Sequence, residues 1–85
     1  MKCVLLNVHN FHSNNKNKDY SVIQVLRDIT GRERDQGYLG KTISQEVFLP
    51  DSLVGSVDNT HIGKDLDLVY EVYGNKAELV SIKIL

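Results

Sequence analysis

Six basic side chains in the first half of the chain could each form an ion pair with a phosphate group: Lys16, Lys18, Arg27, Arg32, Arg34 and Lys41. Three aromatic side chains lie among or just after them: Tyr20, Tyr38 and Phe48. Single-stranded nucleic acid is bound by such a combination, because cations neutralise the phosphates and each base stacked on a ring contributes about 1–3 kcal/mol. We therefore predict these nine residues as a nucleic-acid-binding set.

Ordinary structural roles compete with this interpretation. Asp28, Glu33 and Asp35 lie among the arginines and can neutralise them, so the basic loops can also be plain solvated surface. Tyr38 lies in a Gly-Tyr-Leu-Gly segment, which we expect to be too flexible and too exposed for Tyr38 to be a core residue. Phe48 falls on the polar side of its expected strand, where an exposed ring calls for an explanation.

The remaining aromatic residues give a weaker signal. Tyr70 alternates with leucines and is expected in the core, while Phe11 and Tyr73 fit either a packed or an exposed position. The three rings predicted for stacking could also be ordinary packing residues.

Metal binding and catalysis are not expected. His9 and His12 are three residues apart on a strand, so they point to opposite faces, and no second cysteine completes a tetrahedral site. Asp65 and Asp67 are explained by alternate charges on an outer strand face. No nucleophile motif or phosphate-cradling glycine loop is present. The chain is thus predicted to have no cofactor and no enzymatic activity.

The composition indicates one small globular domain spanning residues 1–85. Residues 1–45 carry seven Lys or Arg against four Asp or Glu, a net charge of +3, while residues 46–85 carry three against seven, a net charge of −4. This asymmetry favours a polyanion-facing first half. Cys3 is the single cysteine, and no apolar run suggests a membrane span or a signal peptide, so we expect a cytoplasmic protein with no membrane partner.

Strand signals dominate the pattern, and helix signals are poor. The expected strands are Lys2–His12, Tyr20–Arg27, Lys41–Leu49, Asp65–Tyr73 and Lys76–Leu85. Strict alternation in the first strand places Val4, Leu6 and Val8 on one face, and Leu5, Asn7, His9 and Phe11 on the other. In the second strand, apolar residues cover both sides, which indicates either burial on both faces or a bulge. In the fifth, Val80, Ile82 and Ile84 are expected to share a face opposite Leu79, Ser81 and Lys83.

The connections complete the expected fold. Ser13–Asp19 reads as a turn, Ile29–Gly40 as a charged loop, and Gly74-Asn75 as a type II′ hairpin turn. The long connection Pro50–Lys64 can begin with a short helical turn at Pro50–Val54. Three strands, a long connection and two strands predict an all-β fold, a small five-stranded OB-like barrel, closed or partly open. A β-sandwich competes less well because it usually needs about seven strands.

The order DYSVIQVLRD, a charged loop, ISQEVFLPDSLV and GKDLDLVYEVYGNKAELVSIKIL resembles the small OB-fold single-stranded-DNA-binding proteins of phages and conjugative elements, of the filamentous-phage helix-destabilising type. The resemblance covers the layout of nearly the whole chain. It implies single-stranded DNA binding without sequence specificity, in the replication or transfer of a phage or mobile element. We expect a homodimer or cooperative assembly, because dimerisation would help a small core and lengthen the DNA track. The binding surface would be the face of the second and third strands with its flanking loops.

Two alternatives stay open. RNA could replace DNA as the ligand, because only contacts to a 2′-hydroxyl distinguish the two. The chain could instead be a small β-barrel protein-interaction module or structural subunit with no nucleic-acid role, which the net charge of −1 and the acidic second half favour. Its interface would then include Leu5, Val69 and Leu79, expected on outer faces.

Overall fold

The computed structural model describes all of residues 1–85 and consists mainly of strands. Five antiparallel strands form one sheet in the order β3-β2-β1-β4-β5. The strands are β1 (Lys2–Ser13), β2 (Lys18–Asp28), β3 (Thr42–Phe48), β4 (Asp65–Tyr73) and β5 (Lys76–Ile84). The prediction of an all-β chain with five strands is confirmed.

Helical segments are short and lie in the connections. The helix α1 (Gly31–Asp35) joins β2 to β3, and the 3₁₀ turns η1 (Asp51–Leu53) and η2 (Asn59–His61) lie between β3 and β4. The turn η1 follows Pro50, as the sequence predicts, whereas η2 was not expected. None of these helices has the length and apolar character needed to cross a membrane.

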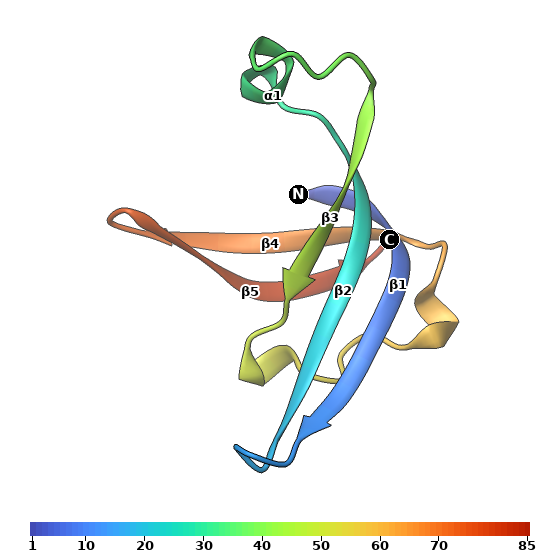
Figure 1. Cartoon of the computed structure of the whole chain (residues 1–85), viewed down its shortest axis with the longest axis vertical. Helices are drawn as coiled ribbons and strands as arrows, with labels where there is room; N and C mark the ends of the chain where they lie inside the picture. Colours follow the sequence, from blue (N-terminus) through green and yellow to red (C-terminus); the bar gives the residue numbers. More distant parts are fainter.

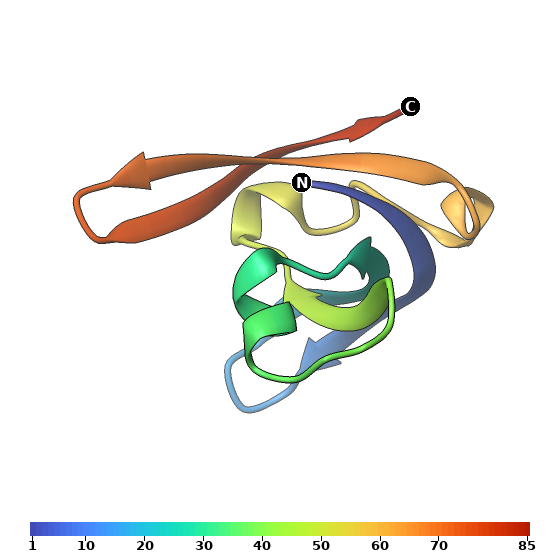
Figure 2. The ribbon, with the colours of Figure 1, turned by 90° about the horizontal axis from the view of Figure 1, so that it is seen from above.

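The sheet bends into two layers that enclose the core. Figure 1 shows β1, β2 and β3 running along the molecule while the β4–β5 hairpin crosses them, and Figure 2 shows the two layers from above. The strand β1 takes part in both layers, because Lys2–Val4 pair with β4, while Val4, Leu5 and Asn7–Ser13 pair with β2. The core contains ten buried residues from both layers and from the β3–β4 connection: Cys3, Leu5, Ile23, Val25, Val47, Leu49, Val57, Leu66, Leu68 and Leu79.

A bulge in β1 changes which side chains face the core. The pairing with β2 shifts between Leu5 and Asn7, so Leu6 has no partner of its own. Leu5 is consequently fully buried, while Leu6 remains 42% exposed. The expected alternation was therefore wrong at this point. Asn7, His9 and Phe11 do lie on the outer face, but Leu5 does not join them.

A second bulge has the same effect in the β4–β5 hairpin. The register shifts so that Val69 pairs with Ser81 and Tyr70 with Leu79, leaving Val80 unpaired. Leu79 turns to the core and is 7% exposed, so the expected faces of β5 were wrong. Because Leu5 and Leu79 are buried, they cannot form the outer apolar interface that the protein-interaction alternative assigned to them.

The barrel is not closed. The strands β3 and β5 lie at the two ends of the strand order and do not pair with each other. Each therefore keeps one edge free of strand pairing, with backbone N–H and C=O groups available for other partners. The sheet is antiparallel and five-stranded as predicted, but its closure into a barrel is not seen.

The far half of the β4–β5 hairpin projects from the body of the molecule (Figure 1). We call residues 71–78 the wing; all eight are exposed. Its turn has Gly74 at φ +57°, as the first position of the expected type II′ turn requires. Tyr70, expected in the core, lies where the wing leaves the body and is 38% exposed.

The charged segment between β2 and β3 contains a helix that the sequence interpretation missed. Thr30 caps α1: its Oγ1 accepts a hydrogen bond from the Glu33 backbone N–H at 3.2 Å, and the Glu33 carboxylate accepts one from the Thr30 N–H at 2.9 Å. This reciprocal capping box satisfies two N–H groups that would otherwise lack partners in a helix of only five residues.

Candidate nucleic-acid interface

The outer face of the β1-β2-β3 layer carries an open groove of about 420 Å³. We call it the outer groove. It lies on the side of the sheet away from the core, because the strand alternation that directs Ile23 and Val47 inward directs Val22 and Phe48 outward. Its lining comes from cross-strand rows, each made of residues that are directly opposite one another in the sheet.

Three rings, His9, Phe11 and Phe48, line the outer groove, and Tyr20 lies beside it, next to Phe11. Phe11 and Tyr20 pair across β1 and β2 with ring centroids 5.4 Å apart and nearly parallel planes, at 21°. His9 continues this group, with its ring 5.0 Å from Phe11. In the next row Val22 lies between His9 and Phe48, and Phe48 is 67% exposed. The sheet thus presents four rings on one face, and Val22 forms the floor between two of them.

Polar side chains form the adjoining row. Asn7, Gln24 and Glu46 are direct neighbours across β1, β2 and β3. Asn7 Oδ1 accepts a hydrogen bond from the Val8 N–H at 2.9 Å, while the Gln24 amide and the Glu46 carboxylate have no protein partner. No lysine or arginine lines the outer groove. A ligand there meets rings, amides and one carboxylate.

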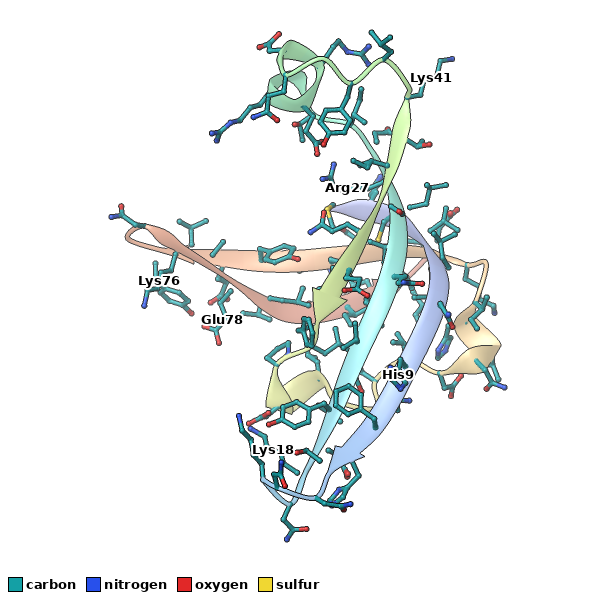
Figure 3. The ribbon with its side chains drawn as sticks, in the orientation of Figure 1. His9, Lys18, Arg27, Lys41, Lys76 and Glu78 are labelled. Carbon is teal, nitrogen blue, oxygen red and sulfur yellow. The ribbon has the colours of Figure 1, made fainter.

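Basic residues lie beyond the two ends of the outer groove. Lys18 and Lys41 mark opposite ends of this layer (Figure 3). Lys18 Nζ is 5.6 Å from the centre of the Tyr20 ring and 2.7 Å from the Asp51 carboxylate, and the hydrogen bond to Asp51 raises the Lys18 pKa. Lys16 is exposed in the neighbouring β1–β2 turn. Cations therefore lie at both ends, with the rings between them, and at one end Lys18 is already paired with Asp51.

Arg27 has a structural partner instead of a free surface. Its guanidinium donates to both carboxylate oxygens of Glu33, at 2.7 and 2.9 Å, and its Nε donates to Gln45 at 2.5 Å. The hydrogen bonds from Arg27 and from the Thr30 N–H lower the Glu33 pKa from 4.5 to about 2. Only 15% of the Arg27 side chain is exposed. The pair fastens α1 to the sheet, so Arg27 is not among the residues on which we base a ligand site.

The other predicted residues lie on α1 or after it. Arg32 and Arg34 are exposed on the helix, and no carboxylate lies within ion-pair distance of either guanidinium. Tyr38 is 48% exposed in the loop that follows and does not line the outer groove. Arg32, Arg34 and Lys41 are thus three exposed cations at one end of the layer, separate from the rings, and the same segment carries the exposed carboxylates of Asp28 and Asp35.

Thus the structure brings Tyr20 and Phe48 together on one face and places five of the six predicted cations beyond the ends of that face: Lys16, Lys18, Arg32, Arg34 and Lys41. It adds five side chains to the predicted set: Asn7, His9, Phe11, Gln24 and Glu46. Alternation along β1 after Leu6 already placed Asn7, His9 and Phe11 on one face, and this pattern was the signal available for them.

Comparison of the chain with protein-family models, with curated proteins and with solved structures finds no match in any of the three. The function is therefore argued from the outer groove and its surroundings.

Proposed function

We propose that the chain binds single-stranded DNA, without requiring a fixed sequence motif, by stacking bases in the outer groove. The observation that carries this proposal is the exposure of aromatic rings on one sheet face. A phenylalanine exposed on a strand keeps its apolar surface in water, and Phe48 does so beside three other rings. Every base has an apolar face, so a platform of this kind accepts any of them.

The charge distribution supports the same ligand. The outer groove contains no cation, whereas Lys16 and Lys18 lie at one end and Arg32, Arg34 and Lys41 lie at the other. A strand placed with its bases on the rings would leave its phosphates to be neutralised mainly at these two ends. Duplex DNA keeps its bases stacked on each other and cannot use the rings in this way.

The strand order also supports an OB-like fold. In such a barrel, β1 pairs with both β2 and β4, as it does here, and the β2–β3 face is a common site for oligonucleotides. We propose an OB-like barrel left open between β3 and β5, acting in the cytoplasm in replication or transfer of a phage or mobile element. The resemblance in chain layout supports this setting.

The test is a fluorescence-anisotropy titration of a labelled oligo-dT of about 30 nucleotides, at about 50 and 200 mM salt. We expect saturable binding that weakens at the higher salt and is not displaced by duplex competitor. No binding at tens of micromolar protein in low salt would overturn the proposal, as would equal displacement by duplex.

A second candidate is a protein-interaction module. The exposed wing favours it, because Val72 is 75% and Tyr73 57% exposed, and β5 has a free edge beside them. Patches of apolar side chains next to an unpaired strand are common protein-docking features. If oligonucleotides fail to bind, the wing is the surface with which to search for a protein partner.

A further inference from the structure

We propose that the polar row of the outer groove gives it a preference for guanine among the bases it stacks. This inference rests on the proposed function, and it concerns which base is favoured at one place on the platform. Three observations carry it: the position of Glu46 next to an exposed ring, the absence of any protein partner for its carboxylate, and the two amides beside it.

Glu46 and Phe48 are two residues apart on β3, so their side chains lie on the same face of the strand. A base stacked on the Phe48 ring can therefore present its Watson–Crick edge toward the Glu46 carboxylate. Glu46 is exposed, and its neighbours in the row supply no positive charge, so both oxygens are available as acceptors. A carboxylate in a site for a polyanion weakens general binding and is explained best by a specific contact.

Guanine is the base that matches a carboxylate. Its N1–H and N2–H donors are adjacent and nearly parallel, so they can give two hydrogen bonds to the two oxygens, as an arginine fork does. Thymine has one N–H between two carbonyl oxygens, and these oxygens are repelled by the carboxylate oxygens. Cytosine and adenine each place a ring nitrogen acceptor beside their amino group. Each of these three bases can make at most one such bond.

The amides of Gln24 and Asn7 complete the match. Gln24 lies directly opposite Glu46 in the sheet, and its NH₂ group can donate to the guanine O6. Asn7 follows in the same row on β1. The row thus places the Glu46 carboxylate, an acceptor, beside the Gln24 amide, a donor. The guanine edge presents its groups in the matching order, with the N2–H and N1–H donors followed by the O6 acceptor.

The test uses oligo-dT of about 12 nucleotides in which one central nucleotide is dT, dC, dA, dG or deoxyinosine, with binding measured by anisotropy. A bidentate contact of this kind predicts that dG binds about tenfold more tightly than dT, since such contacts discriminate between bases by about this factor or more. Deoxyinosine lacks the N2 amino group and should fall between dG and dT.

Two variants test the assignment to Glu46. Glu46→Gln should bring the dG-to-dT ratio close to one while leaving dT binding equal or tighter. Asp65→Asn makes the same change of charge at an exposed carboxylate outside both the outer groove and the wing, and should keep the tenfold ratio. Equal affinity of the parent protein for all five oligonucleotides would overturn the guanine preference and leave the proposed function standing. Failure of all five to bind would overturn both, and a preference that survives in Glu46→Gln would overturn the role of Glu46.

Discussion

Phe48 is the residue on which the stacking proposal depends most, because its ring is two-thirds exposed on the edge strand of the outer groove. Phe48→Ala should weaken oligo-dT binding by about 1–3 kcal/mol, the contribution of one stacked base. The dependence of affinity on salt should stay the same, because no phosphate contact is lost. Anisotropy titrations at several salt concentrations measure both quantities.

Leu39→Ala is the matched control, because Leu39 is 94% exposed and lies outside the outer groove. This variant should bind like the parent, and both variants should keep the parent's circular dichroism spectrum. Parent-like binding by Phe48→Ala would contradict the stacking role.

Arg32 and Arg34 are expected to act through charge alone, since both are exposed and have no ion-pair partner. Arg32→Ala and Arg34→Ala should each weaken binding and reduce the slope of log affinity against log salt by about 0.7 for each lost phosphate contact. Lys83→Ala removes one exposed charge from β5, outside both the outer groove and the wing, and should leave the slope unchanged. An unchanged slope in both arginine variants would show that α1 does not contact phosphates.

Several of these residues could be selected from the sequence, but which of them lie together on one face of the sheet could not be predicted. Phe48 could be selected because it falls on the polar side of its expected strand, and Tyr20 because it lies among the basic residues. Phe11 remained open and Leu5 was placed outside, because alternation cannot show where a bulge adds a residue. Arg27 was predicted as a surface cation. Its ion pair with Glu33, six residues later, forms only because the chain turns back after β2 to begin α1, and the sequence does not show this turn.

At the scale of elements, the attachment of α1 rests on the pair between Arg27 and Glu33, and this pair makes stability depend on pH. The Glu33 pKa is about 2 in the folded protein against 4.5 ordinarily, because Arg27 and the Thr30 N–H bind the charged form. The contribution of the pair is therefore complete above about pH 4.5 and decreases as the pH falls toward 2.

Glu33→Gln should lower thermal stability at pH 7 and reduce the loss of stability between pH 5 and pH 2. Thermal melts followed by circular dichroism across this range measure the effect, and Asp65→Asn, at an exposed carboxylate without an ion-pair partner, serves as the control. A Glu33→Gln variant with the parent's acid sensitivity would show that the pair does not hold α1 to the sheet.

The elements themselves differ in how well the sequence predicted them. The β4–β5 hairpin followed from alternation and from Gly74-Asn75, because both signals are local. The helix α1 has five residues, too few for a 3.6-residue period to be recognised. Its one local signal was Thr30 followed three positions later by Glu33, a capping-box pattern inside a segment dominated by charge and glycine.

For the whole molecule, the open sheet and the wing bear on assembly. The wing exposes Val72 and Tyr73, and the neighbouring edge of β5 is unpaired, so we propose that two copies associate through this part of the chain. Such a dimer would cover apolar surface and carry two outer grooves in one assembly.

Val72→Asp places a charge in the proposed contact and should shift the protein from dimer to monomer in sedimentation velocity. Its affinity for an oligonucleotide that fits one groove should change little. Its affinity for a strand of about 30 nucleotides should fall, because a strand that contacts both grooves of a dimer binds more tightly than one that contacts a single groove. A parent protein that sediments as a monomer at high concentration would contradict the dimer.

Backbone amide chemical-shift mapping by NMR, during titration with oligo-dT, shows directly whether single-stranded DNA binds in the outer groove. We predict that the largest shifts fall in three segments, residues 7–11, 20–24 and 46–48, with smaller shifts around Lys18 and Lys41 at the two ends of the layer. Shifts concentrated in residues 70–79 of the hairpin, or no shifts at all, would show that the outer groove is not a nucleic-acid site.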